Sequence, residues 1–313
     1  MALGSTRASV LFLKKETTNG TPVDPTAGTD AVELQPDITM SPNFESLANE
    51  ALRSSIGVSK PVQGLEQPTG SFSHYMKASG IAGTAPEFRL LLESLFGLVS
   101  SNVTERATTA SSTVSLLKLA AGGTDFKRGK AVLVKDGTNG YNIRPVDSVA
   151  TNDLTLGFNL PVAPLTGINV GICVNYEPAN SGHPAFTAWL YRGNGLAIEA
   201  LAGAQATQMT MSADAGQFLN AAFSLEATKY FFDPIRIAAA DIKLDFLDNA
   251  TTRAATVSAK LYRDPMELAQ ALQDAMNGLG SANAFTVAYN STGANAGKFT
   301  ITSNGTTLSL LNN

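Results

Sequence analysis

The segment PTGSFSHYMKA, residues 68–78, alternates between two kinds of side chain and decides the fold class. One side of the alternation carries Phe72, His74 and Met76. The other side is polar and carries Ser71, Ser73, Tyr75 and Lys77. A period of two residues is typical of a β-strand that buries one face and leaves the other face wet.

A second segment, QATQMTMS at 205–212, repeats this alternation. One side carries Thr207, Met209 and Met211, and the other side carries Gln208, Thr210 and Ser212. Tight turns are indicated by the pairs Asp136-Gly137, Asn139-Gly140, Asn194-Gly195 and Asn304-Gly305. The sequence therefore predicts a mainly β protein whose antiparallel sheets form a sandwich or a barrel.

Two segments carry helical signals. Residues 86–98, PEFRLLLESLFGL, place Pro86 in a first-turn position and end their regular part at Gly97. The second helix is predicted to begin after Asp264 as its N-cap and to end near Gly278. The residues expected to share its buried face are Met266, Leu268, Leu272, Ala275 and Met276.

These elements divide the chain into four segments. We expect residues 1–112 and 176–238 to form the two parts of a β core that packs one helix. Residues 113–175 hold short strands without a helix, and we expect them to form an inserted small closed β-barrel. Residues 239–313 are expected to form a C-terminal α+β accessory unit, which looks unfinished because no further strand follows its last apolar run.

Composition excludes several classes of protein. The 313 residues include 22 basic and 26 acidic side chains, so the net charge is −4, and 44% of the chain is apolar but only 15% is charged. A disordered chain is more charged and less apolar, and a dedicated nucleic-acid binder is basic. Cys173 is the single cysteine, which excludes an intramolecular disulfide. We find no secretory signal and no membrane-spanning segment, and expect a cytoplasmic chain.

The sequence holds no convincing catalytic, cofactor-binding or metal site, and we expect no enzyme. The two histidines, His74 and His183, are far apart and lie in no ligand-spaced cluster. Ser115 and Lys118 match the S-x-x-K motif, but the companion motifs of that chemistry are missing. Cys173 lies in an apolar strand and fits an unreactive thiol.

Residues 41–67 lack a clear period, although apolar side chains are scattered through them. So long an irregular stretch is uncommon in a compact domain unless it is functional. Because its apolar side chains cannot form an amphipathic element, we expect them to bury against another subunit. The residues expected at this contact are Phe44, Leu47, Leu52, Arg53, Ile56 and Val58.

Three longer segments have a distinctive order. They are KKETTNGTPVDPTAGTDAVELQPDITMSPNFE at 14–45, RSSIGVSKPVQGLEQPTGSFSHYMKASGIAGTAPEFRLLLESLFG at 53–97, and GNGLAIEALAGAQATQMTMSADAGQFLNAAFSLEATKYF at 193–231. In this order and spacing the chain resembles the major tail tube proteins of long-tailed, siphovirus-type bacteriophages.

The resemblance implies a structural virion protein without a cofactor. Proteins of this family form closed rings, typically hexamers, whose strands join one inner β-barrel, and the rings stack into a hollow tail tube. The implied partners are further copies of the chain, the tape measure protein, the tail terminator, and baseplate or distal tail proteins. Double-stranded DNA passes through the tube during ejection without specific binding. Assembly is implied in the host bacterial cytoplasm, and the inserted barrel and the C-terminal unit would lie outside the tube. From its aperiodic apolar residues, we expect the segment at 41–67 to dock on the adjacent ring or subunit.

The polar sides of the two alternating segments are expected to line the bore. These residues are Ser71, Ser73, Gln208, Thr210 and Ser212. They are short and uncharged, so they offer phosphate no ammonium or guanidinium group, whereas an outer surface usually carries more charge. We expect Lys77 to lie at a subunit contact or to be offset by a carboxylate. The side chains expected in the subunit core are Phe72, Met76, Met209 and Met211.

Two other interpretations stay open at this point. Another ring-forming virion protein, a tail terminator or a head decoration protein, would share the β-rich and weakly charged composition. A carbohydrate-binding module would need an aromatic platform, for which the single tryptophan, Trp189, is thin support. Electron microscopy of concentrated protein separates the three, because they should give tubes, isolated rings and monomers respectively.

Overall fold

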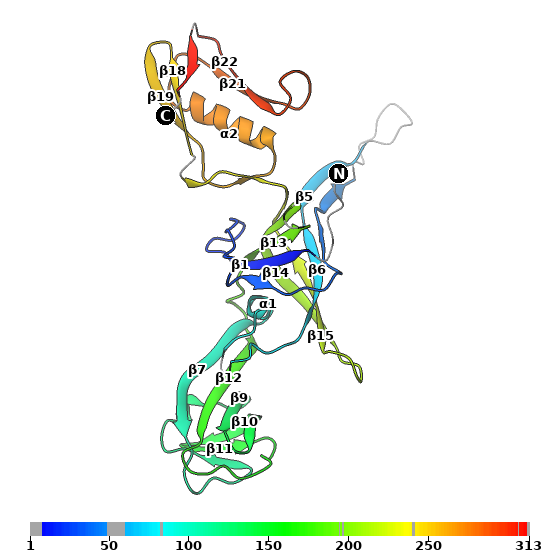
Figure 1. The fold of residues 1–313 in the computed structure, drawn as a ribbon, viewed down its shortest axis with the longest axis vertical. Helices are drawn as coiled ribbons and strands as arrows, with labels where there is room; N and C mark the ends of the chain where they lie inside the picture. The colour runs from blue at the N-terminus through cyan, green and yellow to red at the C-terminus, as the bar shows by residue number, and fades with distance from the viewer. Residues whose placement is uncertain are drawn as a thin grey trace.

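The computed structural model describes residues 8–48, 60–81, 84–193, 195, 197–239, 242–305 and 307–311, with the side chains of 101–103 left out. The chain is mainly β, its sheets are antiparallel, and it has two α-helices, as the sequence predicts. The body is elongated, with a central sheet, a six-stranded sheet toward one end and a C-terminal α+β unit toward the other (Figure 1). Neither α1 nor α2 is long and apolar enough to cross a membrane.

The central sheet has the order β2-β1-β13-β14-β15-β6-β3, and β16 also pairs with β14. Its longest strand, β14, pairs along its first half with β13 and β16 and along its second half with β15. The strand bounds are β1 Val10–Lys15, β2 Ala31–Val32, β3 Thr39–Ser41, β6 Thr69–Tyr75, β13 Phe186–Arg192, β14 Ala197–Ser212, β15 Asn220–Glu226 and β16 Lys229–Phe232. A separate hairpin of β4 (Phe44–Leu47) and β5 (Val62–Glu66) precedes β6.

Helix α1 (Arg89–Phe96) packs on the central sheet and closes the main core. Its Leu91 is fully buried among side chains of β1, β6, β13, β14 and β15. The expectation that Pro86 starts the helix is wrong, because Pro86 lies in the preceding turn, where its carbonyl accepts from the N–H of Arg89. Gly97 ends the helix as predicted, with a φ of 87°, and a Cβ there would lie 2.8 Å from the carbonyl oxygen of Ser181.

The six-stranded sheet has the order β7-β12-β9-β10-β11-β8 and its own apolar core. Its strands are β7 Gly97–Ala107, β8 Leu116–Lys118, β9 Ala131–Asp136, β10 Gly140–Ala150, β11 Asp153–Leu156 and β12 Asn169–Pro178, with a 3-10 turn at Gly123–Asp125. The predicted closed barrel is wrong. Within the described residues the edge strands β7 and β8 meet at one bridge, Thr108–Leu119, because β8 has only three residues that could pair with β7.

The C-terminal unit packs helix α2 against two small sheets. Its elements are β17 Ile235–Arg236, β18 Lys243–Asp248, β19 Thr251–Thr256, β20 Leu261–Tyr262, α2 Pro265–Asn277, β21 Phe285–Asn290, β22 Lys298–Ser303 and β23 Leu308–Leu310. Asp264 caps α2 as predicted, accepting from the N–H of Glu267 at 2.8 Å. The prediction that Met266 lies on the buried face of α2 is wrong. Its side chain is 63% exposed, because that position of the first turn points to solvent.

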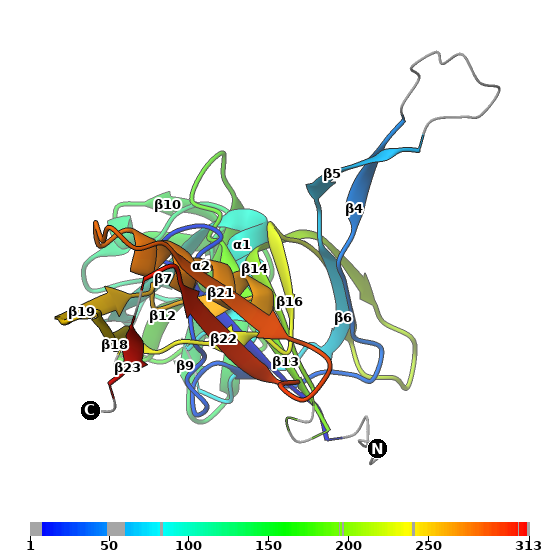
Figure 2. The ribbon, with the colours of Figure 1, turned by 90° about the horizontal axis from the view of Figure 1, so that it is seen from above.

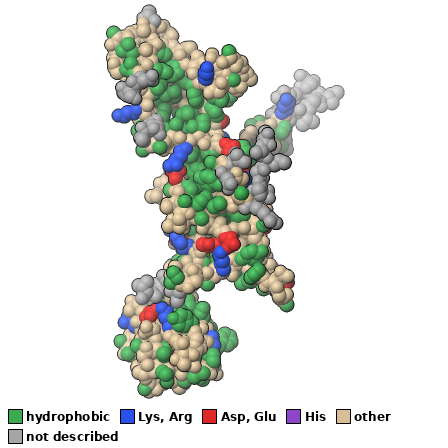
Figure 3. Space-filling model, viewed as in Figure 1, with side chains coloured by type: hydrophobic (Ala, Val, Ile, Leu, Met, Phe, Trp, Pro, Cys, Tyr) green, Lys and Arg blue, Asp and Glu red, His purple; other side chains and the backbone are tan. Residues whose placement is uncertain are grey.

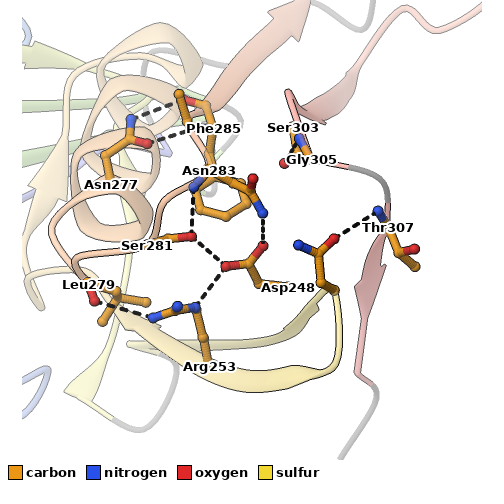
Figure 4. A network of polar contacts seen from close by, with 12 residues as sticks. Asp248, Arg253, Asn277, Leu279, Ser281, Asn283, Phe285, Ser303, Gly305 and Thr307 are labelled. Atoms are coloured by element: carbon orange, nitrogen blue, oxygen red, sulfur yellow. Dashed lines mark hydrogen bonds and ion pairs between the residues drawn. The ribbon is translucent and has the colours of Figure 1, made fainter.

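One carboxylate organises the polar side of this unit (Figure 4). Asp248 is buried and accepts from Arg253 Nε at 2.8 Å, from Ser281 Oγ at 2.5 Å and from Asn283 Nδ2 at 2.6 Å. The hydrogen bonds from Ser281 and Asn283, with the nearby Arg253, lower the pKa of Asp248. The network ties β18 and β19 to the loop between α2 and β21.

Candidate functional site

The two alternating segments predicted from sequence lie in the same sheet and share a face. Gln208 of β14 lies opposite Ser224 of β15, which in turn lies opposite Ser71 of β6. Thr210 and Ser73 are related in the same way through Ala222. Residues directly opposite one another in a sheet point to the same side. The predicted lining residues therefore form one surface, here called the hydroxyl face and consisting of Ser71, Ser73, Gln208, Thr210 and Ser212.

A β-bulge brings β14 into this register. The pairing with β15 shifts between Ala206 and Gln208, so Thr207 is the extra residue of the bulge. Because of this shift, Ala206 is buried and Met209 also reaches the core, although the two are three positions apart. Thr207, predicted on the apolar side, is exposed.

The side chains of the hydroxyl face are short, and its paired positions in the described strands carry no cation. Within the described strands β3, β6, β14 and β15, its rows continue into Thr39, Tyr75, Asn220, Ala222 and Ser224, and the next row along β15 adds Glu226. The charged member of these rows is the carboxylate of Glu226, and none is Lys or Arg. Ser71 and Thr39 hydrogen-bond to each other across the sheet, at 2.8 Å between hydroxyl oxygens.

Ser73 differs from the other four residues of the hydroxyl face. Ser71, Gln208, Thr210 and Ser212 are exposed, but Ser73 is buried. Its hydroxyl donates to the carboxylate of Asp37, which also accepts from the Ser73 N–H at 3.2 Å. Asp37, from the loop before β3, therefore covers this position and adds a negative charge beside the face.

The cation nearest the end of β6 is neutralised. Lys77 pairs with Glu33, and its Nζ lies 3.6 Å from a carboxylate oxygen of Glu87. The hydrogen bond to Glu33 raises the pKa of Lys77. The prediction that a carboxylate offsets Lys77 is confirmed.

The opposite face of these strands is mostly apolar and faces the main core. Phe72 pairs in register with Phe223, and their ring centroids are 5.9 Å apart. Met76 and Met209 are partly buried against this core, as predicted. The prediction is wrong for Met211, which is 57% exposed, because it lies near the end of the β14–β15 hairpin beyond the core cluster.

His74 belongs to the same buried face. It is 1% exposed, its ring packs on Phe88 at 4.7 Å between centroids, and its Nε2 lies 2.8 Å from Glu87 Oε1. Burial raises the pKa of Glu87, but hydrogen bonds from His74 and from the N–H of Glu33 lower it overall. This pair joins the back of β6 to the turn that leads into α1.

The other histidine fastens the far end of α1. His183 has Nδ1 2.8 Å from the Ser94 carbonyl oxygen and Nε2 2.9 Å from the Ala179 carbonyl oxygen. Both partners are acceptors, so both ring nitrogens can donate only when the ring is protonated, and the pKa of His183 is raised. Ser94 also accepts through its hydroxyl from the N–H of Ala206, next to the bulge in β14.

The β4–β5 hairpin carries the described part of the second predicted surface. Residues 41–67 are not irregular throughout, as the sequence suggested, because Phe44–Leu47 pairs with Val62–Glu66 across a register shift. That shift hides the period of two. Phe44 and Leu47 are exposed at 44% and 47%. The other predicted contact residues, Leu52, Arg53, Ile56 and Val58, lie outside the described residues.

The hairpin carries several exposed apolar side chains. Leu47 lies directly opposite Val62, which is 56% exposed, and Leu65 is 72% exposed. At the base of the hairpin, Glu66 accepts from the N–H of Tyr230 and pairs with Arg263 at 2.6 Å. The hairpin is thus fixed at its base and uncovered along its length (Figure 2).

Other chemistry is sparse. Among the described residues, no group of three or more His, Cys, Asp and Glu side chains is placed to hold a metal ion. Cys173 lies half-buried in β12, and burial raises the pKa of its thiol. Ser115 precedes β8 and its backbone carbonyl accepts from Leu156, which is the role of an ordinary sheet residue.

Comparison with known proteins adds one finding. A family model described as phage tail tube protein matches residues 6–308, nearly the whole chain. No curated protein matches the chain.

Proposed function

The chain belongs to the phage tail tube protein family, and from this premise we propose that it forms closed rings which stack into the hollow tube that phage DNA crosses during ejection. Membership of the family makes the protein a structural component of the bacteriophage tail that assembles with copies of itself into a tube. The proposal goes beyond this family assignment in three respects, which are the closed ring, the stacking of rings and the passage of DNA.

The hydroxyl face carries the proposal. Its residues lie on β6 and β14, and its rows continue over β3 and β15. Its charges are Glu226 and the nearby Asp37, and none of its paired positions in these described strands carries Lys or Arg. DNA binding draws its affinity mainly from cations that neutralise phosphates. A wall that lets a polyanion slide past should lack such cations, and this face meets that requirement. We propose that Ser71, Gln208, Thr210 and Ser212 face the bore, and that Asp37 stands in front of the buried Ser73 at the position where the sequence placed a lining hydroxyl.

Ring closure would use the edges of the same sheet. Beyond Ala204, β14 has left its partner β13, so its residues 207–212 pair on one side only, with β15, in the described chain. Unpaired strand edges favour pairing with another chain. A head-to-tail contact that repeats between copies forms a ring when the rotations from each copy to the next add up to a full turn. We expect six copies per ring, as is typical of the family that the sequence resembles.

The remaining parts of the assembly follow from this arrangement. Residues 1–112 and 176–238 would form the tube core, while 113–175 and 239–313 would lie outside it. A tape measure protein would fill the bore before ejection, and a tail terminator and baseplate or distal tail proteins would bind the two ends. Assembly would take place in the host bacterial cytoplasm.

Electron microscopy of the purified protein at high concentration tests the proposal. Long tubes of uniform width, with a central channel, are expected. Isolated rings would instead fit a tail terminator or head decoration protein, and featureless monomers would contradict ring formation altogether.

A further inference from the structure

An apolar hollow on the central sheet lies beside the first strand. A cleft of about 390 Å³, here called the β1 cleft, is lined by Ala8, Val10, Phe12, Pro25, Ala27 and Tyr191. Figure 3 shows hydrophobic side chains gathered on this side of the central sheet, around β1. Two of the lining side chains, Phe12 and Tyr191, are in edge-to-face contact at 5.4 Å between ring centroids.

Strand β1 turns one face to the main core, and its other face carries Val10, Phe12 and Lys14, of which Phe12 is partly buried against a second cluster around Trp189. Leu11 and Leu13 are buried in that core, whereas Val10 on the other face is 41% exposed. A strand with one wet face normally places polar side chains there. The exposed Val10 therefore fits a position that is covered in the assembled state, beside the partly buried Phe12.

The cleft carries no charge of its own, and the charges near it are paired. Its lining residues are all uncharged. Asp24 pairs with Arg236 at 2.5 Å, and Lys14 pairs with Asp30 at 2.8 Å. The cleft therefore suits an uncharged apolar segment, since burying an unpaired charge there would be costly.

The β4–β5 hairpin presents exposed apolar side chains next to one exposed carboxylate, that of Glu45. Leu47 and Val62 form an exposed apolar cross-strand pair, and Glu66 is already neutralised by Arg263. A two-stranded hairpin is at best marginally stable in water by itself, so this one gains from a partner surface.

The hairpin and the cleft also lie on opposite sides of the body. Figure 2 shows β4 and β5 projecting from one side, whereas the blue strand β1 begins on the other side. A head-to-tail stack requires a projection and a hollow on opposite sides. Each copy then offers its projection to one neighbour and its hollow to the other.

We infer that the β1 cleft of each subunit receives the β4–β5 hairpin of a subunit in the adjacent ring, with Leu47 and Val62 packing near Val10 and Phe12. This inference rests on the proposed function, because it names the surface that receives the projecting segment. It makes the occupant of the cleft a second copy of this chain.

Disulfide trapping in assembled tubes tests the contact. In a Cys173→Ser background, Leu47→Cys is combined with Val10→Cys, and oxidation is followed by gel electrophoresis without reductant. Links between rings should produce a ladder that continues well beyond the number of subunits in one ring. The matched control combines Leu47→Cys with Tyr141→Cys, on β10 and 65% exposed, and it should give no such ladder.

The outcomes separate the inference from the function on which it rests. Tubes without the Val10–Leu47 link, or a ladder that stops at one ring, would overturn the inference while leaving tube formation intact. A protein that forms no tubes even without substitutions would overturn the proposed function instead.

A charge in the cleft provides a second test that needs no cysteine. Val10→Asp should leave folded rings but prevent them from stacking, whereas Tyr141→Asp should leave tubes normal. Normal tubes from Val10→Asp would overturn the inference.

Discussion

Gln208 and Ser71 lie on strands that flank β15, and both stand directly opposite Ser224, so their side chains leave the sheet on the same side. These two residues come from segments more than a hundred positions apart in the sequence. Their juxtaposition joins the two alternating segments into one wall without Lys or Arg at its paired positions, and the proposed function rests on that wall.

Cations placed on this wall should hinder DNA. In Gln208→Arg/Thr210→Arg/Ser212→Arg, tubes should still assemble, but genome delivery should fall by about tenfold or more, because arginine binds phosphate. Higher salt should restore part of the delivery, since each phosphate contact weakens as counterions compete. Infectivity of phage carrying the variant, measured across a salt series, checks this.

The control for this prediction places the same charge elsewhere. Thr286→Arg/Thr300→Arg/Thr302→Arg adds three arginines to the exposed hairpin of the C-terminal unit. It should deliver DNA normally. Equal delivery by both triple variants would mean that the hydroxyl face does not border the DNA path.

Removal of the β4–β5 hairpin should stop assembly after the ring. We expect a variant in which residues 44–65 are replaced by a short Gly-Ser linker to stay folded and soluble, because Glu66 keeps its bonds to Tyr230 and Arg263. Sedimentation and electron microscopy should find rings without tubes. Tubes at the normal protein concentration would show that the hairpin is not needed for stacking.

The clamp of His183 on α1 predicts a pH dependence of stability. The pKa of His183 is raised because two carbonyl oxygens favour the protonated ring. Its stabilising contribution is therefore complete below the ordinary pKa of histidine and is lost as the pH rises through the raised value. Melting temperatures between about pH 5 and pH 8 should fall more with pH in the wild type than in His183→Gln. His74 is present in both proteins, so identical pH profiles would exclude a role of His183.

The core under α1 should dominate the stability of the central sheet. Leu91 is fully buried, so Leu91→Ala should lower the free energy of unfolding by about 2–5 kcal/mol. Met211 is exposed, so Met211→Ala should change it by less than about 0.5 kcal/mol. Denaturant titration followed by the fluorescence of Trp189, which is buried in the central sheet, measures both. A large loss in Met211→Ala would contradict the placement of that side chain outside the core.

The sequence predicts what depends on local period and turn chemistry. Alternation identified the faces of β6 and of the end of β14, and the cap at Asp264 identified the start of α2. The burial of Ser73 could not be predicted, because Asp37 reaches it from a distant loop. The exposure of Met211 depends on where α1 and the core end, which no local pattern encodes.

Irregular pairing accounts for the other differences. The register shift between β4 and β5 breaks the period of two, so this hairpin looked like an irregular stretch. The three-residue length of β8 leaves the six-stranded sheet open, although its strand order brings β7 and β8 to a bridge. Both features depend on residues far apart in the sequence.

A cryo-electron microscopy reconstruction of the assembled tube tests the central claim most directly. The account predicts that β6 and the second half of β14 border the channel, with Ser71, Gln208, Thr210 and Ser212 facing it. A reconstruction in which this face points to the outside of the tube, or is buried between subunits, would contradict the account.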